Sequence, residues 1–207
     1  LPWSARGIAT AADLAHAHLS ALLTAEARQG ADELLLAVPP GYTREQLGLL
    51  VGVQTPPHRD LKRYDRLREI GVNRVSFCFE IFDRKLFEEI CPGKHAEYGL
   101  DYYLEATRYC ATLARRGPKG EPWVTNGEII AGLEPPESSI AAIDWITSVG
   151  AIPTVCVFRP LVGTDLEDAD PPKTEELVPV FRRLYEATME AGLPIGCAPN
   201  IHVSLVM

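Results

Sequence analysis

The stretch "IIAGLEPPESSIAAIDWI", residues 129–146, contains a complete transition from strand to helix. Its first half is an apolar run that ends in Gly-Leu-Glu, which is typical of a buried strand entering a turn. Two prolines follow, and then Ile140, Ile143 and Ile146 recur at the spacing of one helix face. The stretch therefore predicts a strand–turn–helix unit of a parallel α/β protein, in which chemistry is placed where the strands end.

The same alternation continues on both sides of this unit. Gly71, Gly150 and Gly192 stand where helices are expected to stop, whereas Pro179 interrupts the start of the last helical pattern. The segment "CPGK", residues 91–94, is expected to be a turn that ends a helix. The expected strands are 49–55, 74–82, 126–134, 152–160 and 194–205, and the expected helices are 60–71, 84–90, 99–117, 138–150 and 174–192. Strands that alternate with helices predict a parallel sheet with right-handed crossovers.

Length and composition narrow the class of protein. A chain of 207 residues predicts one domain, in which residues 1–48 form a mainly helical lead-in and residues 49–207 form the βα units. The net charge of −8 argues against a nucleic-acid binder, because phosphate contacts need a basic face. No apolar run reaches the ~20 residues of a membrane helix. Because the chain begins at Leu1 and ends within an apolar run, we expect residues to be missing at one or both ends.

The cysteines point to a reducing compartment. There are five of them, widely spaced and without a C-x-x-C pair. That pattern predicts free thiols in a cytoplasmic protein, and it predicts neither a disulfide framework nor a metal site held by a local cysteine motif.

Residues 74–82, "RVSFCFEIF", carry the strongest site signal. Side chains alternate along a strand, so the larger apolar residues share one face and Ser76, Cys78 and Glu80 share the other. Glu80 would then lie near the carboxyl end of its strand. A buried carboxylate needs a partner, so Glu80 is either a ligand contact or half of a structural ion pair.

Polar residues also end the neighbouring strands. Gln54, Arg159 and Asn200 each stand at the end of an expected strand and could converge with Glu80 on one edge of the sheet. Arg159 precedes a proline and could instead pin a loop. Lys94, in the "CPGK" turn, could present a cation to a substrate, but we expect it to be exposed.

Three stretches resemble one family. They are "LVGVQTPPHRDLKRYDRLREIGV" (50–72), "NRVSFCFEIFDRKLFEEICPGK" (73–94) and "GEIIAGLEPPESSIAAIDWITSVGAIPTVCVFRPLVGTDL" (127–166). They are similar to the later strands of radical S-adenosylmethionine enzymes, and most of all to the biotin synthase and lipoyl synthase branch. The "GLE" turn and "RPLVGTDL" (159–166) carry much of the likeness, which extends over roughly residues 49–170.

The resemblance implies a partial (β/α) TIM-type barrel with parallel strands. Members of the family bind S-adenosylmethionine against a [4Fe–4S] cluster and cleave it to a 5′-deoxyadenosyl radical, which acts on a small-molecule substrate. An electron donor such as flavodoxin or ferredoxin is implied as a partner. Carried over by position, the cofactor contacts would be Glu80, Ile130, Val157 and Phe158, and the substrate or carboxylate contacts would be Gln54, Arg159 and Asn200. No catalytic residue is assigned.

The chain departs from the family in one important respect, because the cluster motif C-x-x-x-C-x-x-C is absent. Either the cluster-bearing segment lies outside this chain, or the protein is a degenerate barrel that binds a nucleotide-like ligand or a partner subunit. A third hypothesis is an unrelated aldolase-type barrel that uses a lysine such as Lys94. The sequence assigns neither a substrate nor an oligomeric state.

Overall fold

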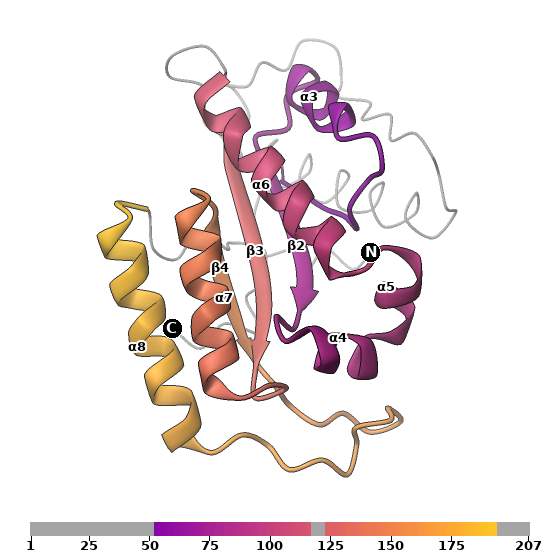
Figure 1. The fold of residues 1–207 in the computed structure, drawn as a ribbon, viewed down its shortest axis with the longest axis vertical. Coiled ribbons are helices and arrows are strands. Elements are labelled where there is room, and N and C mark those ends of the chain that lie inside the picture. Colours follow the sequence, from indigo (N-terminus) through magenta and orange to yellow (C-terminus); the bar gives the residue numbers. More distant parts are fainter. Residues whose placement is uncertain (1–51, 117–122, 194–207) are drawn as a thin grey trace, which may run out of the picture. The chain divides into compact units, whose positions relative to one another are not determined.

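The computed structural model describes residues 52–116 and 123–193, which form a parallel sheet covered by helices (Figure 1). The sheet has four strands in the order β1-β2-β3-β4, and every adjacent pair is parallel. The strands are β1 (Gly52–Gln54), β2 (Arg74–Glu80), β3 (Val124–Ala131) and β4 (Ile152–Val157). The predicted α/β fold with parallel strands is therefore confirmed.

Helices follow the strands as the sequence predicts. Gly71, Gly150 and Gly192 have positive φ angles at helix ends, as expected for their places in the sequence. The helices are α3 (Lys62–Glu69), α4 (Arg84–Ile90), α5 (Pro92–Glu97), α6 (Leu100–Arg116), α7 (Pro136–Ser148) and α8 (Thr174–Glu190). No helix in the described ranges is long and apolar enough to cross a membrane.

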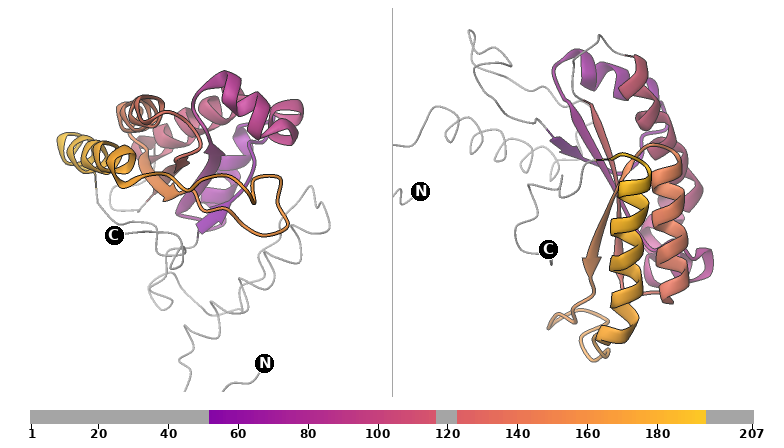
Figure 2. Two further views of the ribbon diagram at one scale, coloured as in Figure 1. Left: turned by 90° about the horizontal axis from the view of Figure 1, so that it is seen from below. Right: turned by 90° about the vertical axis from the view of Figure 1, so that its left-hand side faces the viewer.

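The two faces of the sheet differ in chemistry. On one face, Val75 and Phe77 are fully buried, as their alternation in the sequence predicts. Phe79 and Ile81, at and after the irregular end of β2, are also fully buried. Helices α6, α7 and α8 lie against this side, all on the same face of the sheet (Figure 2). The other side, here called the polar face, carries the alternate residues of the four strands. Register places Gln54, Arg74, Ser76, Cys78, Asn126, Glu128, Ile130, Thr154 and Cys156 on it.

Two local predictions need correction. The "CPGK" segment is not only a turn, because α5 begins at Pro92 immediately after α4. Proline is favoured at a helix start, since its missing N–H has no partner there in any case. Pro179 lies inside α8, which begins at Thr174 and runs through it. Helix α8 packs on α7 and β4, and this packing outweighs the one backbone bond that proline removes.

Some predictions fall outside the described residues. They include the helical lead-in at 1–48, the strand at 194–205, and Asn200 with Cys197. The division of the chain into a lead-in and a βα region therefore stays a prediction.

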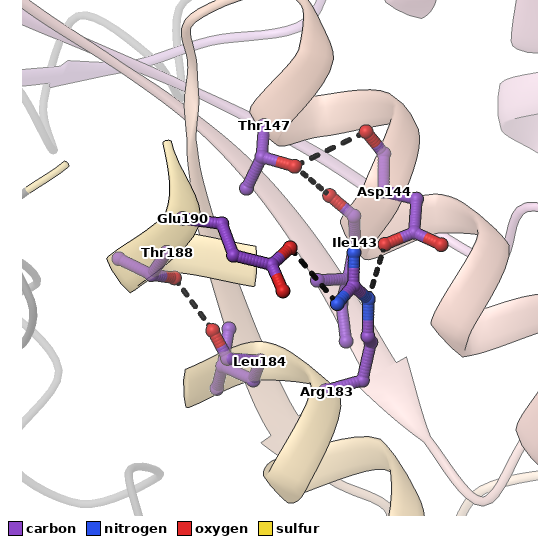
Figure 3. Close-up of polar contacts among 7 residues, drawn as sticks. All are labelled: Ile143, Asp144, Thr147, Arg183, Leu184, Thr188 and Glu190. Carbon is purple, nitrogen blue, oxygen red and sulfur yellow. Dashed lines mark hydrogen bonds and ion pairs between the residues drawn. The ribbon is translucent and has the colours of Figure 1, made fainter. Parts of the chain in front are cut away.

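Helices α7 and α8 are joined by an ion-pair network (Figure 3). Arg183 of α8 donates from Nε to Asp144 Oδ1 of α7 at 2.6 Å, and from Nη1 to Glu190 Oε2 at 3.1 Å. The Arg183 side chain is 29% exposed, and both carboxylates are more exposed still. Solvent therefore screens the network, and we expect its contribution to stability to be modest.

Replacing Arg183 by methionine keeps the long apolar stem and removes the charge. We expect a loss of about 0.5–1 kcal/mol in the free energy of unfolding, measured by urea denaturation. The matched control is Arg182→Met, at the neighbouring exposed position of α8. Equal unfolding free energies for the two variants would show that the network contributes nothing.

Candidate functional site

The end of β2 is irregular at Glu80. The pairing of β2 with β3 shifts there, so that Cys78 is opposite Glu128 but Glu80 is opposite Ile129. Among the described residues, Glu80 is the one non-glycine with a positive φ, at 65°. A bulge of this kind redirects a side chain, and a left-handed backbone at a non-glycine residue is a strain often found at functional sites. The alternation that the sequence predicts thus holds through Cys78 and is broken at Glu80.

Lys94 holds the Glu80 carboxylate. Its Nζ donates to Glu80 Oε1 at 2.6 Å and to the carbonyl oxygen of Cys78 at 2.7 Å, and it lies over the Tyr103 ring at 5.9 Å from the centroid. The Lys94 side chain is 33% exposed and that of Glu80 is 23% exposed. The expectation of an exposed lysine is wrong, because the short α5 brings Lys94 back over the end of β2.

These contacts bear on the aldolase hypothesis. Two oxygen acceptors stabilise the ammonium form of Lys94, whereas Schiff-base formation needs the neutral amine. The geometry of Lys94 therefore argues against that reaction.

A second polar group lies on the polar face beside this pair. Glu128 Oε2 accepts hydrogen bonds from Gln54 Nε2 at 2.9 Å and from Cys78 Sγ at 2.8 Å. Gln54 Nε2 also contacts Cys78 Sγ. Three neighbouring strands thus contribute one side chain each, and Glu128 is only 4% exposed. Cys78 links the two groups, since its thiol contacts Glu128 and its carbonyl oxygen contacts Lys94.

A hydrogen-bonded row continues from this group toward the amino ends of the strands. Arg74 Nε donates to Asn126 Oδ1 at 3.0 Å, and Asn126 Nδ2 donates to Thr154 Oγ1 at 3.1 Å. All three side chains are buried. The Arg74 guanidinium also faces Glu128, with Nη2 4.0 Å from Oε1.

The thiols near these carboxylates are held in the neutral form. Burial raises the pKa of Cys78, and the neighbouring Glu128 and Glu80 raise it further. Burial also raises the pKa of Cys156, with Glu128 and Glu80 acting in the same direction and Arg159 opposing them.

Glu134 is a buried carboxylate with a structural contact at both oxygens. Its Oε2 accepts from the backbone N–H groups of Phe82 and Asp83 at 2.9 and 2.8 Å, and its Oε1 accepts from Ser139 Oγ at 3.1 Å. It therefore ties the loop after β2 to the loop after β3 and to α7. Burial raises the pKa of Glu134, although these three donors act in the opposite direction.

The remaining predicted contacts fall around the ends of β3 and β4. Ile130 is half-buried on the polar face and pairs with Cys156, whereas Val157 pairs with Ala131 on the helix-covered side. The Phe158 backbone N–H donates to the Ala131 carbonyl oxygen at 2.9 Å. Arg159 follows the end of β4 and is exposed. Their roles as cofactor or substrate contacts stay predictions.

Two residues of this site were missed or misjudged at the sequence level. Glu128 was missed, although it lies in the apolar run 127–131 and alternation places it on the same face as Ile130. A charged residue within an expected buried strand was the signal that could have identified it. Lys94 was visible but was assigned to an exposed turn. Its contact with Glu80 depends on how α4 and α5 fold back, which no local pattern reports.

Comparisons with known proteins identify similar chains. Over 131 residues, 63% of this chain, the sequence is 32% identical to bacteriochlorophyllide c C-7(1)-hydroxylase of Chlorobaculum limnaeum, of which the match covers 31%. Coproporphyrinogen III oxidase (HemN) of Escherichia coli, described as a radical SAM enzyme, matches 87% of this chain and 46% of its own, with a TM-score of 0.50 and 16% identity. Methylornithine synthase (PylB) matches 83% of this chain and 43% of its own, with a TM-score of 0.51 and 18% identity.

These matches establish the class of fold. The chain shares the parallel α/β architecture of the two enzymes of known structure, one of which is a radical SAM enzyme. It spans less than half the length of each matched protein, and no family model matches it. None of the three matched proteins is named as a biotin synthase or a lipoyl synthase, so the likeness to that branch stays a prediction.

Proposed function

We propose that this chain is the S-adenosylmethionine-binding core of a radical SAM enzyme that acts on a small molecule. The observation that carries the proposal is the geometry of Glu80. Glu80 lies at the carboxyl end of β2, where the strand pairing is irregular and the Glu80 backbone is left-handed. Lys94 Nζ holds the carboxylate by a hydrogen bond of 2.6 Å to Glu80 Oε1. Parallel α/β proteins bind ligands at this end of their strands.

The described residues fit the nucleotide better than the cluster. One oxygen of Glu80 is bonded to Lys94, and the side chain remains partly exposed, so the carboxylate can accept hydrogen bonds from ribose hydroxyls or an ammonium group. Ile130, also partly exposed, offers an apolar surface for an adenine ring. Within residues 52–116 and 123–193, no group of three or more His, Cys, Asp or Glu side chains could hold a metal ion.

The cluster therefore enters the proposal only through likeness to other proteins. In a radical SAM enzyme an iron–sulfur cluster supplies the electron that cleaves S-adenosylmethionine, and a flavodoxin or ferredoxin type of donor would reduce it. None of the described residues has the arrangement to bind such a cluster.

The class of substrate rests on the matched proteins. Two of them are named for tetrapyrroles and the third for a small amino acid, so all three names point to small molecules. The acidic net charge of −8 also disfavours a nucleic-acid substrate.

The proposal is tested by S-adenosylmethionine binding to the full chain. In Glu80→Gln we expect an affinity about 10–100-fold weaker, because a hydrogen bond to a charged group contributes about 1.5–3 kcal/mol. Equilibrium dialysis with labelled S-adenosylmethionine measures this affinity directly. Glu105→Gln, at an exposed position of α6, is the matched control and should bind like the wild type.

Two outcomes would contradict the proposal. If Glu80→Gln unfolds more easily but binds S-adenosylmethionine with unchanged affinity, the Glu80–Lys94 pair is structural. If the wild-type protein does not bind S-adenosylmethionine, the proposed function fails.

A further inference from the structure

Glu80 occupies the middle of a tight three-residue turn. The Ile81 backbone N–H donates to the Phe79 carbonyl oxygen at 2.7 Å, and Glu80 between them has a φ of 65°. These are the features of a γ-turn with a positive φ, which is rare and strained. Such strain persists only where the surrounding structure holds the backbone in place.

The backbone around this turn is held by contacts that do not involve Lys94. Phe79 and Ile81, which flank Glu80, are both fully buried. Glu134 accepts hydrogen bonds from the next two backbone N–H groups along the chain, at 2.9 and 2.8 Å. These contacts fix the place of the Glu80 backbone, but they do not fix the direction of its flexible side chain.

Lys94 fixes the direction of that side chain. Its Nζ donates to Glu80 Oε1 at 2.6 Å and to the Cys78 carbonyl oxygen at 2.7 Å, so the ammonium is itself tied to the strand that carries Glu80. The Tyr103 ring, only 2% exposed, packs beside the ammonium. The ammonium therefore has a defined position, and it gives the Glu80 carboxylate a defined position as well.

The Glu80–Lys94 pair is open to solvent, so its contribution to stability is small. The two side chains are 23% and 33% exposed. Water screens an ion pair of this kind, and holding two long side chains in one geometry costs entropy. Because Lys94 contacts Oε1, the other oxygen of Glu80 can accept a hydrogen bond from a ligand. The main effect of the pair is thus to orient an acceptor.

We propose that Lys94 is a positioning residue for nucleotide binding that acts through Glu80. Its ammonium holds the Glu80 carboxylate ready for the donor group that S-adenosylmethionine presents, so that this side chain need not be ordered when the ligand binds. The proposal rests on the proposed function for the identity of the ligand. It adds a residue from α5 to a site otherwise built from strand ends.

Lys94→Met tests the proposal on the full chain, because it keeps the apolar stem and removes the ammonium. Equilibrium dialysis with labelled S-adenosylmethionine should show an affinity about tenfold weaker than that of the wild type, because an acceptor that was ordered in advance must now be ordered on binding. Lys85→Met, at an exposed position of α4, is the matched control and should bind like the wild type. The urea midpoints of the two variants should be similar.

A double variant shows whether Lys94 acts through Glu80. In a Glu80→Ala background, Lys94→Met should weaken binding no further, because the carboxylate that Lys94 orients is gone. Losses of affinity that simply add in the double variant would overturn the proposal. If Lys94→Met does not fold, the same comparison is made with Lys94→Arg, whose planar fork keeps the charge but cannot reproduce the two contacts of a compact ammonium.

Two further results would overturn the proposal. One is an unchanged affinity in Lys94→Met, and the other is a loss of affinity that only follows a loss of folded protein, which would make the pair structural. Glu80→Gln, measured on the same ligand, separates this proposal from the proposed function. If Glu80→Gln weakens binding and Lys94→Met does not, only the role of Lys94 fails. If the wild type does not bind S-adenosylmethionine, both proposals fail.

Discussion

Replacing Gly132 by alanine is expected to lower the free energy of unfolding by roughly 2–4 kcal/mol. Gly132, in the turn after β3, has a φ of +100°, which an alanine adopts only with strain. An added Cβ would also lie 2.6 Å from Cγ and 2.7 Å from Cβ of Pro172, in the loop between β4 and α8. Because Pro172 is a rigid ring, that loop would have to move. Urea denaturation followed by circular dichroism measures the loss.

Gly71→Ala provides the matched control. Gly71 has a similar φ of +104°, but an added Cβ would meet nothing within 4 Å. It should show the backbone strain alone, on the order of 1 kcal/mol. If Gly132→Ala is no more destabilising than Gly71→Ala, the close approach of Pro172 to Gly132 does not exist in solution.

The second large effect is expected at Glu134. Glu134→Ala removes the acceptor for the Phe82 and Asp83 backbone N–H groups and for the Ser139 hydroxyl. We expect a loss of roughly 2–4 kcal/mol in the free energy of unfolding, because donors that lose a buried partner keep their desolvation penalty. Glu89→Ala, at an exposed position of α4, should change stability by no more than about 0.5 kcal/mol. Similar losses in the two variants would contradict the role assigned to Glu134.

Glu134→Gln separates hydrogen bonding from charge. The amide oxygen can still accept hydrogen bonds from the backbone, so this variant should be more stable than Glu134→Ala. Burial raises the pKa of Glu134 in the folded protein above the usual 4.5, so the folded state holds its proton to higher pH than the unfolded state does. The contribution of Glu134 is therefore greatest below pH 4.5 and falls as pH rises through the folded pKa. Wild type should lose stability relative to Glu134→Gln over that interval and then level off; a difference that does not change with pH would contradict this.

Both positions connect stability to the proposed site. Glu134 ties down Phe82 and Asp83, which follow Glu80 within a few residues, and Gly132 lies at the end of the strand that carries Glu128 and Ile130. Variants at either position should therefore also weaken S-adenosylmethionine binding, through the backbone that positions these side chains.

Much of the fold was predictable because its cause is local. Alternation in residues 74–82 separated Val75 and Phe77 from Ser76 and Cys78, since successive side chains of any strand point to opposite faces. The helical spacing of Ile143 and Ile146 predicted the buried stripe of α7, and both are fully buried. Local reasoning failed at the two prolines. Pro92 begins helix α5 instead of ending a helix, because proline is tolerated in the first turn, and Pro179 lies inside α8, which is stabilised by tertiary packing.

The candidate site was only partly predictable. Glu80 and Gln54 could be found at strand ends, because the ends of parallel strands meet at one edge. The bulge that turns Glu80 could not, since it arises from the shift in pairing between β2 and β3. Nor could the sequence indicate that Gln54 would contact Glu128, which is 74 positions away in the chain.

Within the described residues, the sequence by itself thus determined the order of the strands and of the helices other than α5, the two faces of β2 as far as Cys78, and the helix ends at Gly71, Gly150 and Gly192, because backbone geometry couples these to near neighbours. Only the tertiary structure decided that Lys94 holds Glu80, that Glu134 joins two loops, and that one oxygen of Glu128 lacks a partner. Those contacts depend on strand register and on the path of α4 and α5. Register and helix path follow from packing over the whole sheet, which no short stretch of the chain contains.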